Sequence, residues 1–164
     1  MQVTIRDSGD LKRLNRQLGD IADGKELRKE LTAGFRGVLT PLTGQVKAAY
    51  RASPSTGRRT RPGPSLRSLL ARATRVEVRT TGRQAGVRLR VDGRKMPSGA
   101  RSLPAYWEGY KRPWRWPVYG DRTNWVQGRA RPTFDRIVEP HADDALRAID
   151  EVLDGVRRKL ERSR

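Results

Sequence analysis

The segment "KELRKELTAGFRGVLTPLTGQVKAA" (residues 25–49) carries the most sustained structural pattern in the chain. Its apolar residues recur at steps of three and four, which keeps one side of a helix apolar over about seven turns. They are Leu27, Leu31, Phe35, Val38, Leu42, Val46 and Ala49. Pro41 lies inside this pattern, and because the pattern resumes in phase we expect the proline to kink the helix rather than end it. The segment therefore predicts a long N-terminal helix with one buried face.

Helical spacing recurs on both sides of this segment. After the β-prone "QVTI" (2–5), Leu11, Leu14, Leu18 and Ile21 predict a short helix. From Pro132 onward the apolar positions predict a second long helix, interrupted near Pro140: Phe134, Val138, Ala145, Ile149, Val152, Val156 and Leu160. Acidic residues gather at the start of that helix and basic ones at its end, an order that complements the helix dipole.

Two segments with strict alternation predict a β-hairpin. In "RVEVRT" (75–80) and "GVRLRV" (86–91), valine and leucine alternate with charged residues, and "TGRQA" between them supplies turn residues. The hairpin should have one apolar and one cationic face. Facing arginines repel one another unless something anionic covers them, and a solvated, salt-screened face is the alternative. With the flanking helices, the hairpin predicts an α+β fold for one domain, residues 1–164: a small antiparallel sheet flanked by long N-terminal and C-terminal helices, with extended basic loops.

Three further segments are predicted to lie outside the core. Residues 51–65 and 92–104 are rich in Pro, Gly and Arg and read as extended basic loops. Residues 106–131 form an aromatic and Pro-rich arm that holds all four tryptophans of the chain. Trp and Arg are enriched at protein–protein hot spots, so the arm is a candidate partner interface. Its candidate contact residues are Tyr110, Trp114, Arg115, Trp116, Tyr119 and Trp125. For Trp114 and Trp116, a lid on the core, a subunit contact and base stacking all remain open.

The charge of the chain is strongly positive and uneven. The net charge is +18, and residues 51–131 alone carry 20 basic and four acidic residues. Such an excess favours an anionic partner, either nucleic acid or an acidic protein surface. The candidate contacts with DNA or an acidic partner are Arg58, Arg59, Arg61, Arg88, Arg90, Arg94, Lys95 and Arg101.

Residues suited to catalysis are scarce. The chain has no cysteine and a single histidine, His141, so a His/Cys metal cluster is impossible. Asp143 and Asp144 would point about 100° apart on a helix, which is poor geometry for an acid–base pair. Neither a phosphate-binding glycine loop nor a Gly-x-Ser-x-Gly motif occurs. We therefore expect no enzymatic activity, cofactor or metal. We also expect a soluble protein without a membrane partner, because no apolar run approaches the roughly 18 residues of a membrane span.

The order of several short motifs resembles the neck and tail-completion proteins of long-tailed bacteriophages, the broad family that includes the minor tail protein Z type. "PSTGRR" (54–59) and "SLRSLL" (65–70) resemble the family's Pro-x-Thr-Gly element and the Ser/Leu segment after it. "YWEGY" (106–110) resembles its Tyr/Glu/Gly element, with Glu108 and Gly109 in the matching places. "RPTFDRIVEPH" (131–141) resembles the Arg-Pro-x-Phe segment that opens the C-terminal helix. The resemblance spans roughly residues 25 to 160.

This resemblance implies a structural virion protein rather than an enzyme. A member of the family would form a ring at the head–tail junction, joining the tail to the capsid connector around the DNA channel. The implied partners are copies of itself, expected as a hexamer from tail symmetry, adjacent neck, terminator and tail-tube proteins, and DNA in the lumen through non-specific contact. The implied location is the virion, after assembly in the cytoplasm of the bacterial host. A stand-alone basic protein that binds nucleic acid is the alternative.

Overall fold

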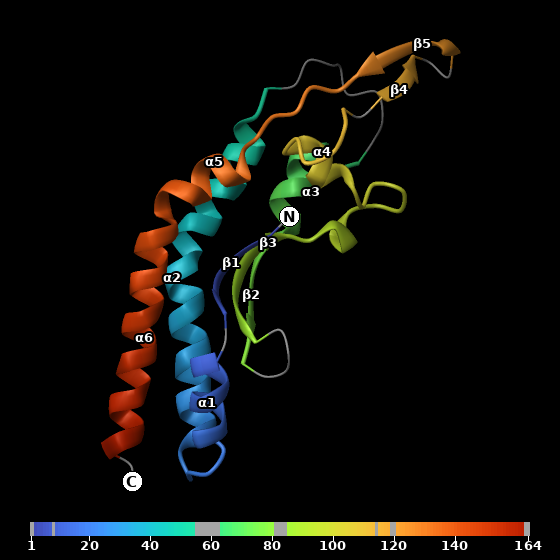
Figure 1. Ribbon diagram of the computed structural model, residues 1–164. Helices are drawn as coiled ribbons and strands as arrows, with labels where there is room; N and C mark the ends of the chain where they lie inside the picture. The colour runs from blue at the N-terminus through green and yellow to red at the C-terminus, as the bar shows by residue number, and fades with distance from the viewer. Residues whose placement is uncertain are drawn as a thin grey trace.

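The structure is a computed structural model that describes residues 2–7, 9–54, 63–80, 85–113, 115–118 and 121–162. Within these ranges, side chains are described from Leu11 onward, except those of residues 116–118. Two long helices lie side by side and a three-stranded sheet packs against them, while a small hairpin projects from one end (Figure 1).

The N-terminal half supplies the first long helix. α1 (Gly9–Gln17) buries Leu11 and Leu14, and a short turn leads into α2 (Gly24–Ala52). α2 runs through Pro41 without ending, as the in-phase apolar pattern predicts. Its buried side includes most of the predicted positions, namely Leu27, Leu31, Phe35, Leu42 and Val46, together with Leu39 and Tyr50. The long N-terminal helix is therefore confirmed.

The C-terminal residues form the second long helix, which runs antiparallel to α2 (Figure 1). α5 (Phe134–Val138), the 3-10 turn η2 (Glu139–His141) and α6 (Ala142–Arg162) follow one another, so the break near Pro140 falls where the sequence predicts it. α2 and α6 approach closely at Gly34, where a Cβ atom would lie 2.6 Å from Cγ1 of Val152. A larger residue there would force the two helices apart.

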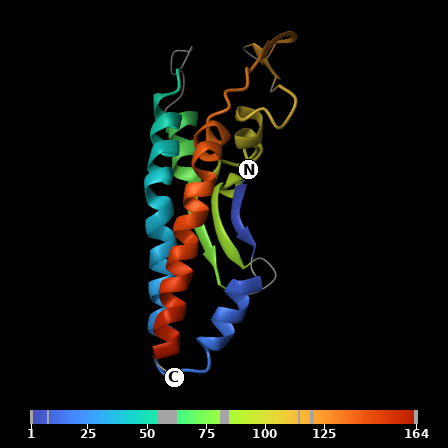
Figure 2. The ribbon, with the colours of Figure 1, turned by 60° about the vertical axis from the view of Figure 1, so that its left-hand side comes forward.

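The main sheet consists of β1 (Gln2–Asp7), β2 (Thr74–Arg79) and β3 (Gly86–Val91), in the order β1-β3-β2 with both pairs antiparallel. The predicted hairpin is present. Its register places Val76 opposite Leu89 and Val78 opposite Val87, so the apolar residues share one face. The helix pair covers one side of this sheet, and Val87 and Leu89 belong to the same buried core as Phe35 (Figure 2).

Short elements connect the sheet to the arm. α3 (Leu66–Ala73) begins at Ser65, whose Oγ accepts a hydrogen bond from the backbone N–H of Ser68. Residues 92–104 consist mostly of turns and irregular backbone, with several exposed residues. They contain the 3-10 turn η1 (Gly93–Lys95) and the first residues of α4 (Leu103–Trp107), and they bury Met96 and Pro104. These two apolar side chains are covered by the fold despite the basic residues around them. Of the other predicted basic loop, residues 55–62 lie outside the described residues.

The predicted arm contains a second, separate sheet. β4 (Arg115–Val118) and β5 (Asp121–Gln127) pair antiparallel and form the hairpin that projects beyond the helices (Figure 1). The fold class is thus confirmed: α+β, with a small antiparallel sheet and flanking long helices. Among the described residues, no helix combines the length and the apolar character that a membrane crossing requires.

Candidate partner-binding arm and its anchor

The hairpin β4–β5 presents aromatic and cationic side chains to solvent. All seven residues of β5 are exposed, and Trp125 and Val126 expose 44% and 41% of their surface. The guanidinium of Arg115 lies 5.6 Å from the centre of the Trp125 ring, which is within the range of a cation–π contact. Trp125 also donates a hydrogen bond from Nε1 to the backbone oxygen of Arg122, 2.6 Å away. This side of the arm is therefore an ordered surface that the chain itself leaves uncovered.

The two ends of the arm meet at its base. The backbone N–H of Arg131 donates to the backbone oxygen of Trp107 across 2.6 Å. Gly109 has φ +86°, a left-handed conformation that lets α4 end in a Schellman turn. In that turn Tyr110 N donates to Ala105 O at 2.9 Å and Gly109 N donates to Tyr106 O at 3.2 Å. A Cβ atom on Gly109 would also lie 3.2 Å from Cβ of Ala130. A glycine here allows the incoming and outgoing strands of the arm to come together.

Glu108 fixes this base to the body of the protein. Its side chain is buried, and its Oε1 accepts a hydrogen bond from the hydroxyl of Tyr50 at 2.7 Å. Its Oε2 accepts from the backbone N–H groups of Thr133 and Phe134 at 2.7 and 3.0 Å. The first N–H groups of a helix have no partner within the helix. Glu108 therefore caps α5 from a distant part of the chain and links α5 to the end of α2.

Trp107 completes the anchor. Its ring meets the ring of Tyr50 edge-on, with centroids 6.4 Å apart, and its Nε1 donates to Oγ1 of Thr133 at 3.2 Å. The guanidinium of Arg131 lies over the Trp107 ring at 5.9 Å and also donates to the backbone oxygen of Pro54. These hydrogen bonds and ring contacts attach "YWEGY" (106–110) to the end of α2 and to the start of α5.

The electrostatics of the anchor suit a structural role. Burial raises the pKa of Glu108, and the hydrogen bonds from Tyr50, Thr133 and Phe134 offset part of that effect. Burial, followed by the negative charge of Glu108, raises the pKa of Tyr50. Tyr50 therefore stays a neutral hydroxyl donor at ordinary pH. Both carboxylate oxygens of Glu108 accept hydrogen bonds from the fold itself, so Glu108 and Tyr50 together hold α2, the base of the arm and α5 in contact.

Comparisons with models of protein families, with curated proteins and with solved structures find no match to this chain.

Within the described part of the chain, no group of three or more His, Cys, Asp or Glu residues could hold a metal ion.

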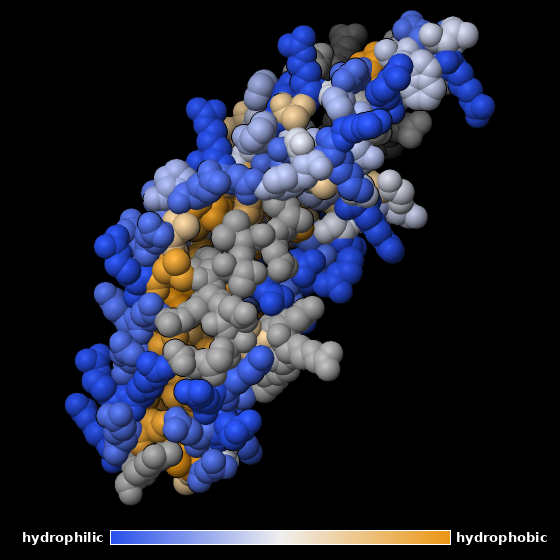
Figure 3. Space-filling model, viewed as in Figure 1, coloured by the Kyte–Doolittle hydropathy of each residue, from blue (hydrophilic) through white to orange (hydrophobic). Residues whose placement is uncertain are grey.

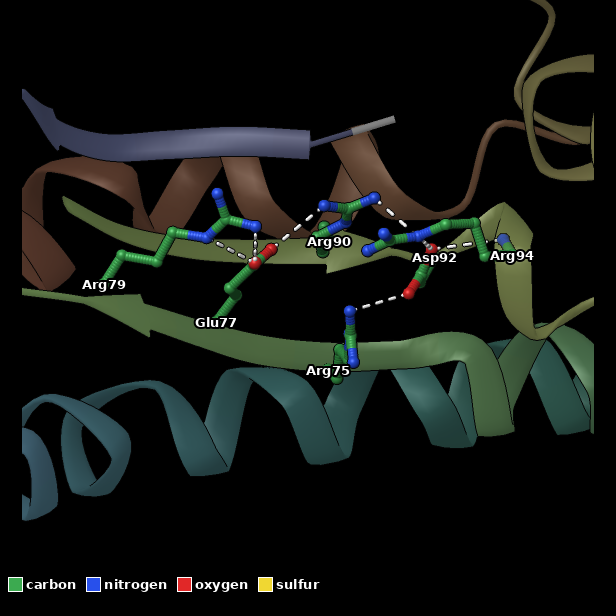
Figure 4. A network of polar contacts seen from close by, with 6 residues as sticks. All are labelled: Arg75, Glu77, Arg79, Arg90, Asp92 and Arg94. Atoms are coloured by element: carbon green, nitrogen blue, oxygen red, sulfur yellow. Dashed lines mark hydrogen bonds and ion pairs between the residues drawn. The ribbon is translucent and has the colours of Figure 1, made fainter. Parts of the chain in front are cut away.

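The cationic face of the main sheet contains its own counter-ions. Asp92, almost fully buried, lies among three arginines, with ion pairs to Arg75 at 2.7 Å, Arg94 at 3.2 Å and Arg90 at 3.3 Å (Figure 4). Glu77 binds Arg79 at 2.6 Å and Arg90 at 3.0 Å. Arg90 thus bridges the two carboxylates in one continuous network. We call these six residues the arginine–carboxylate network.

This network changes the interpretation of the facing arginines. Arg75 lies opposite Arg90 in the sheet register, and each finds a carboxylate of the same chain beside it. Neither an external anion nor bulk salt is needed to separate them. Among the predicted anion contacts, Arg90 and Arg94 therefore have carboxylate partners within the fold. Arg94, Lys95 and Arg101 are exposed to solvent.

Asp92 should make the stability of the fold sensitive to acid. Burial opposes its ionisation, but the hydrogen bonds from Arg94 and the charges of Arg75 and Arg90 outweigh it and lower the pKa of Asp92. A lowered folded-state pKa contributes stability that is present above the ordinary value of about 3.9 and is lost as the pH falls through the folded-state pKa. Asp92→Asn should therefore cost about 1–3 kcal/mol of unfolding free energy at pH 7.

The difference between wild type and Asp92→Asn should shrink as the pH falls below about 3.9 and disappear once the pH is below the folded-state pKa of Asp92, where both chains lack this charge. Urea unfolding at a series of pH values measures the difference, and the exposed Asp20→Asn is the matched control. A difference between the two chains that does not decrease as the pH is lowered would show that ionised Asp92 is not what holds the three arginines.

The remaining predicted site residues fall into two groups. Arg115 and Trp125 meet on the arm, and Tyr110 lies exposed at its base. Trp116 lies opposite Val126 in the backbone register. Five further predicted positions lie outside the described residues: Trp114, Tyr119, Arg58, Arg59 and Arg61. Arg88 lies on β3 opposite Glu77.

Sequence reasoning missed Tyr50 and Arg131 as parts of the anchor. Tyr50 ends the apolar pattern of α2, and a tyrosine there could have indicated a buried hydroxyl that needs an acceptor. Arg131 precedes Pro132 in a segment that resembles a family motif, but no spacing rule connects it to Trp107.

Proposed function

We propose that this chain is a structural virion protein of the phage head–tail junction, a neck or tail-completion ring subunit that joins the tail to the capsid connector around the DNA channel. The observation that carries the proposal is the arm: an ordered hairpin, anchored at both ends, whose aromatic and cationic residues face solvent. Its partners in this function are further copies of the chain, the adjacent neck, terminator and tail-tube proteins, and DNA in the lumen.

The physics of a two-stranded hairpin supports an assembly role. An isolated hairpin of this kind is marginally stable in water, because it has no core of its own. Here the Schellman turn at Gly109 and the buried Glu108 hold its base, so the chain builds an anchor for a surface that contributes little to its own core. Trp125, Val126 and Arg115 are residue types that stabilise interfaces once a partner covers them.

A stand-alone nucleic-acid-binding protein is the second candidate function. Exposed arginines beside an exposed Trp125 ring are suited to phosphate contacts and base stacking. The arginine–carboxylate network argues against a nucleic-acid role for the sheet face, since each of its four arginines already has a carboxylate partner within the fold. Retention of the isolated protein on duplex DNA over a salt series tests it, because neutralising several phosphates gives a steep loss of affinity with salt.

Particles produced without this protein should contain filled heads and separate tails, or tails with faulty ends, and should lose infectivity. Negative-stain electron microscopy and plaque titres measure the two effects. A wild-type copy supplied from a plasmid is the control and should restore joined particles. Normal infectious virions in the absence of the protein would contradict the proposal.

A further inference from the structure

The arm carries a concentrated positive charge. Residues 111–129 contain five basic residues and one acidic residue. The basic residues, all exposed, are Lys111, Arg112, Arg115, Arg122 and Arg129. The single acid, Asp121, accepts hydrogen bonds from the N–H and the hydroxyl of Thr123, at 2.8 and 2.7 Å. The carboxylate is thus occupied by the turn of the hairpin, which leaves the five cations as the outward charge of the arm.

The opposite charge gathers on the start of the C-terminal helices. Residues 134–154 contain seven acidic residues and two arginines. The side of α6 that faces the core carries the buried residues Ala145, Ile149 and Leu153. The acidic residues of α6 therefore lie on the outer side of the helix. The exposed acidic residues of the segment are Glu139, Asp143, Asp144, Glu151 and Asp154. We call these five residues the acidic helix face.

The chain only partly neutralises this face. Asp144 pairs with Arg147 and Asp154 pairs with Arg157, both within one turn of the same helix. Such exposed helical pairs contribute only a few tenths of a kcal/mol and are easily exchanged. Nearby, burial and then the charge of Glu139 raise the pKa of Asp135, as expected where negative charge is crowded. The face is therefore able to accept external cations.

We infer that the arm of one copy docks on the acidic helix face of a second copy. This inference rests on the proposed ring function and names the self-contact within it. The two surfaces have opposite charge. In the space-filling view, hydrophilic residues line the outer side of α6, and the arm shows hydrophilic residues beside pale and apolar ones (Figure 3). A contact led by charge and completed by Trp125 fits such surfaces better than an apolar groove would.

The placement of the two surfaces fits a closed ring. The arm and the α5 end of the C-terminal helices lie at the same end of the elongated molecule, with the hairpin turned away from α6 (Figure 1). A cyclic ring is generated by rotation alone, so surfaces in contact must lie at the same level along its axis. An arm that reaches outward from one copy then meets α5 and the first turns of α6 in the next. The contact is head-to-tail, because each copy gives an arm and receives another.

Charge reversal tests the contact directly. The arm variant Arg112→Glu/Arg115→Glu/Arg122→Glu has two basic and four acidic residues in its arm, so the arm is negative like its own face. The face variant Glu139→Lys/Asp143→Lys/Asp144→Lys has three lysines and two acids in the acidic helix face, so that face is positive like its own arm. Each variant alone should self-associate at least about 100-fold more weakly than wild type at 0.15 M salt, because like charges then meet. Sedimentation velocity over a concentration series measures this.

Mixing the two variants should restore assembly. The negative arm of the arm variant then meets the positive face of the face variant. The positive arm of the face variant meets the negative face of the arm variant. A single chain with all six substitutions should also assemble. Matched controls reverse three charges at exposed positions on α1, near the start of α2 and at the end of α6, which lie away from the arm (Figure 1). These controls, Lys12→Glu/Arg13→Glu/Arg16→Glu and Asp20→Lys/Glu26→Lys/Glu161→Lys, should assemble as wild type does.

Each other outcome overturns a defined statement. If wild type assembles and the reversals have no effect, or if the mixture stays dissociated, the arm–face contact is wrong while the ring proposal stands. If wild type stays monomeric at low and physiological salt, both fail. If the charge swap behaves as expected but particles form normally without the protein, the contact stands and the head–tail role fails. If the arm variant assembles normally but no longer binds a labelled DNA duplex that wild type binds, the arm is a nucleic-acid-binding surface instead.

Discussion

Glu108→Ala should lower the free energy of unfolding by about 3–5 kcal/mol. The substitution removes the acceptor of three hydrogen bonds at once. The Tyr50 hydroxyl and the backbone N–H groups of Thr133 and Phe134, at the start of α5, then have no carboxylate to bind. Each buried donor that loses its partner costs about 1–3 kcal/mol. Water can reach the partly buried Thr133 amide, which keeps the total below the sum of three full penalties.

Urea unfolding at pH 7 and 25 °C measures this effect. Glu108→Gln retains the size of the side chain and one carbonyl acceptor, so it should cost about half as much. The matched surface control is Glu161→Ala, at an exposed position of α6, which should change stability by less than about 0.5 kcal/mol. Tyr50→Phe combined with Glu108→Ala should cost less than the two single changes together, since they share one hydrogen bond. A loss below about 1 kcal/mol for Glu108→Ala would contradict the anchor.

Removal of the arm should abolish self-assembly and leave the fold of the monomer intact. Because residues 107–109 and 130–131 already touch, a short Gly-Ser linker can replace residues 111–129 without opening the base. The free energy of unfolding should change by less than about 1 kcal/mol, as the exposed hairpin buries little of the core and a shorter loop costs slightly less entropy. The dissociation constant for assembly should rise by at least about 100-fold.

Sedimentation velocity and urea unfolding on the same preparations separate the two effects. Arg115→Ala/Trp125→Ala is the smaller variant of the same test, because it removes the cation–π pair and keeps the hairpin. It should weaken assembly in the same direction with the monomer stability unchanged. A truncated chain that loses several kcal/mol of stability would assign the arm to the core, and one that assembles normally would remove its interface role.

Local patterns were sufficient to predict the main elements. The step of three and four from Leu27 to Val46 predicts α2, and alternation around Val76 and Leu89 predicts the hairpin and its apolar face, because each depends on the geometry of its own segment. The same reasoning is incomplete for residues 92–104. Gly, Pro and basic residues predict a loop there, and they do not indicate that Met96 and Pro104 are buried, because the rest of the folded chain covers these two side chains.

The charged residues show the same limit. The sequence indicates a row of facing arginines, and it cannot indicate that Asp92, one residue beyond the end of β3, turns back among Arg75, Arg90 and Arg94. The sequence shows only that Asp92 carries one negative charge. Whether that carboxylate is solvated or binds three guanidinium groups depends on how β2, β3 and η1 pack.

The sequence by itself therefore determined the α+β class, the two long helices, the hairpin with its apolar face, and the gathering of tryptophans and positive charge in residues 106–131. These follow from periodicity and composition, which act within a few turns or strands. Only the tertiary structure decided what holds the arm: Tyr50 and Glu108 lie 58 residues apart, and Glu108 caps a helix that begins 26 residues later. Hydrogen bonds over such separations form only when packing has already brought the segments together, so no local pattern encodes them.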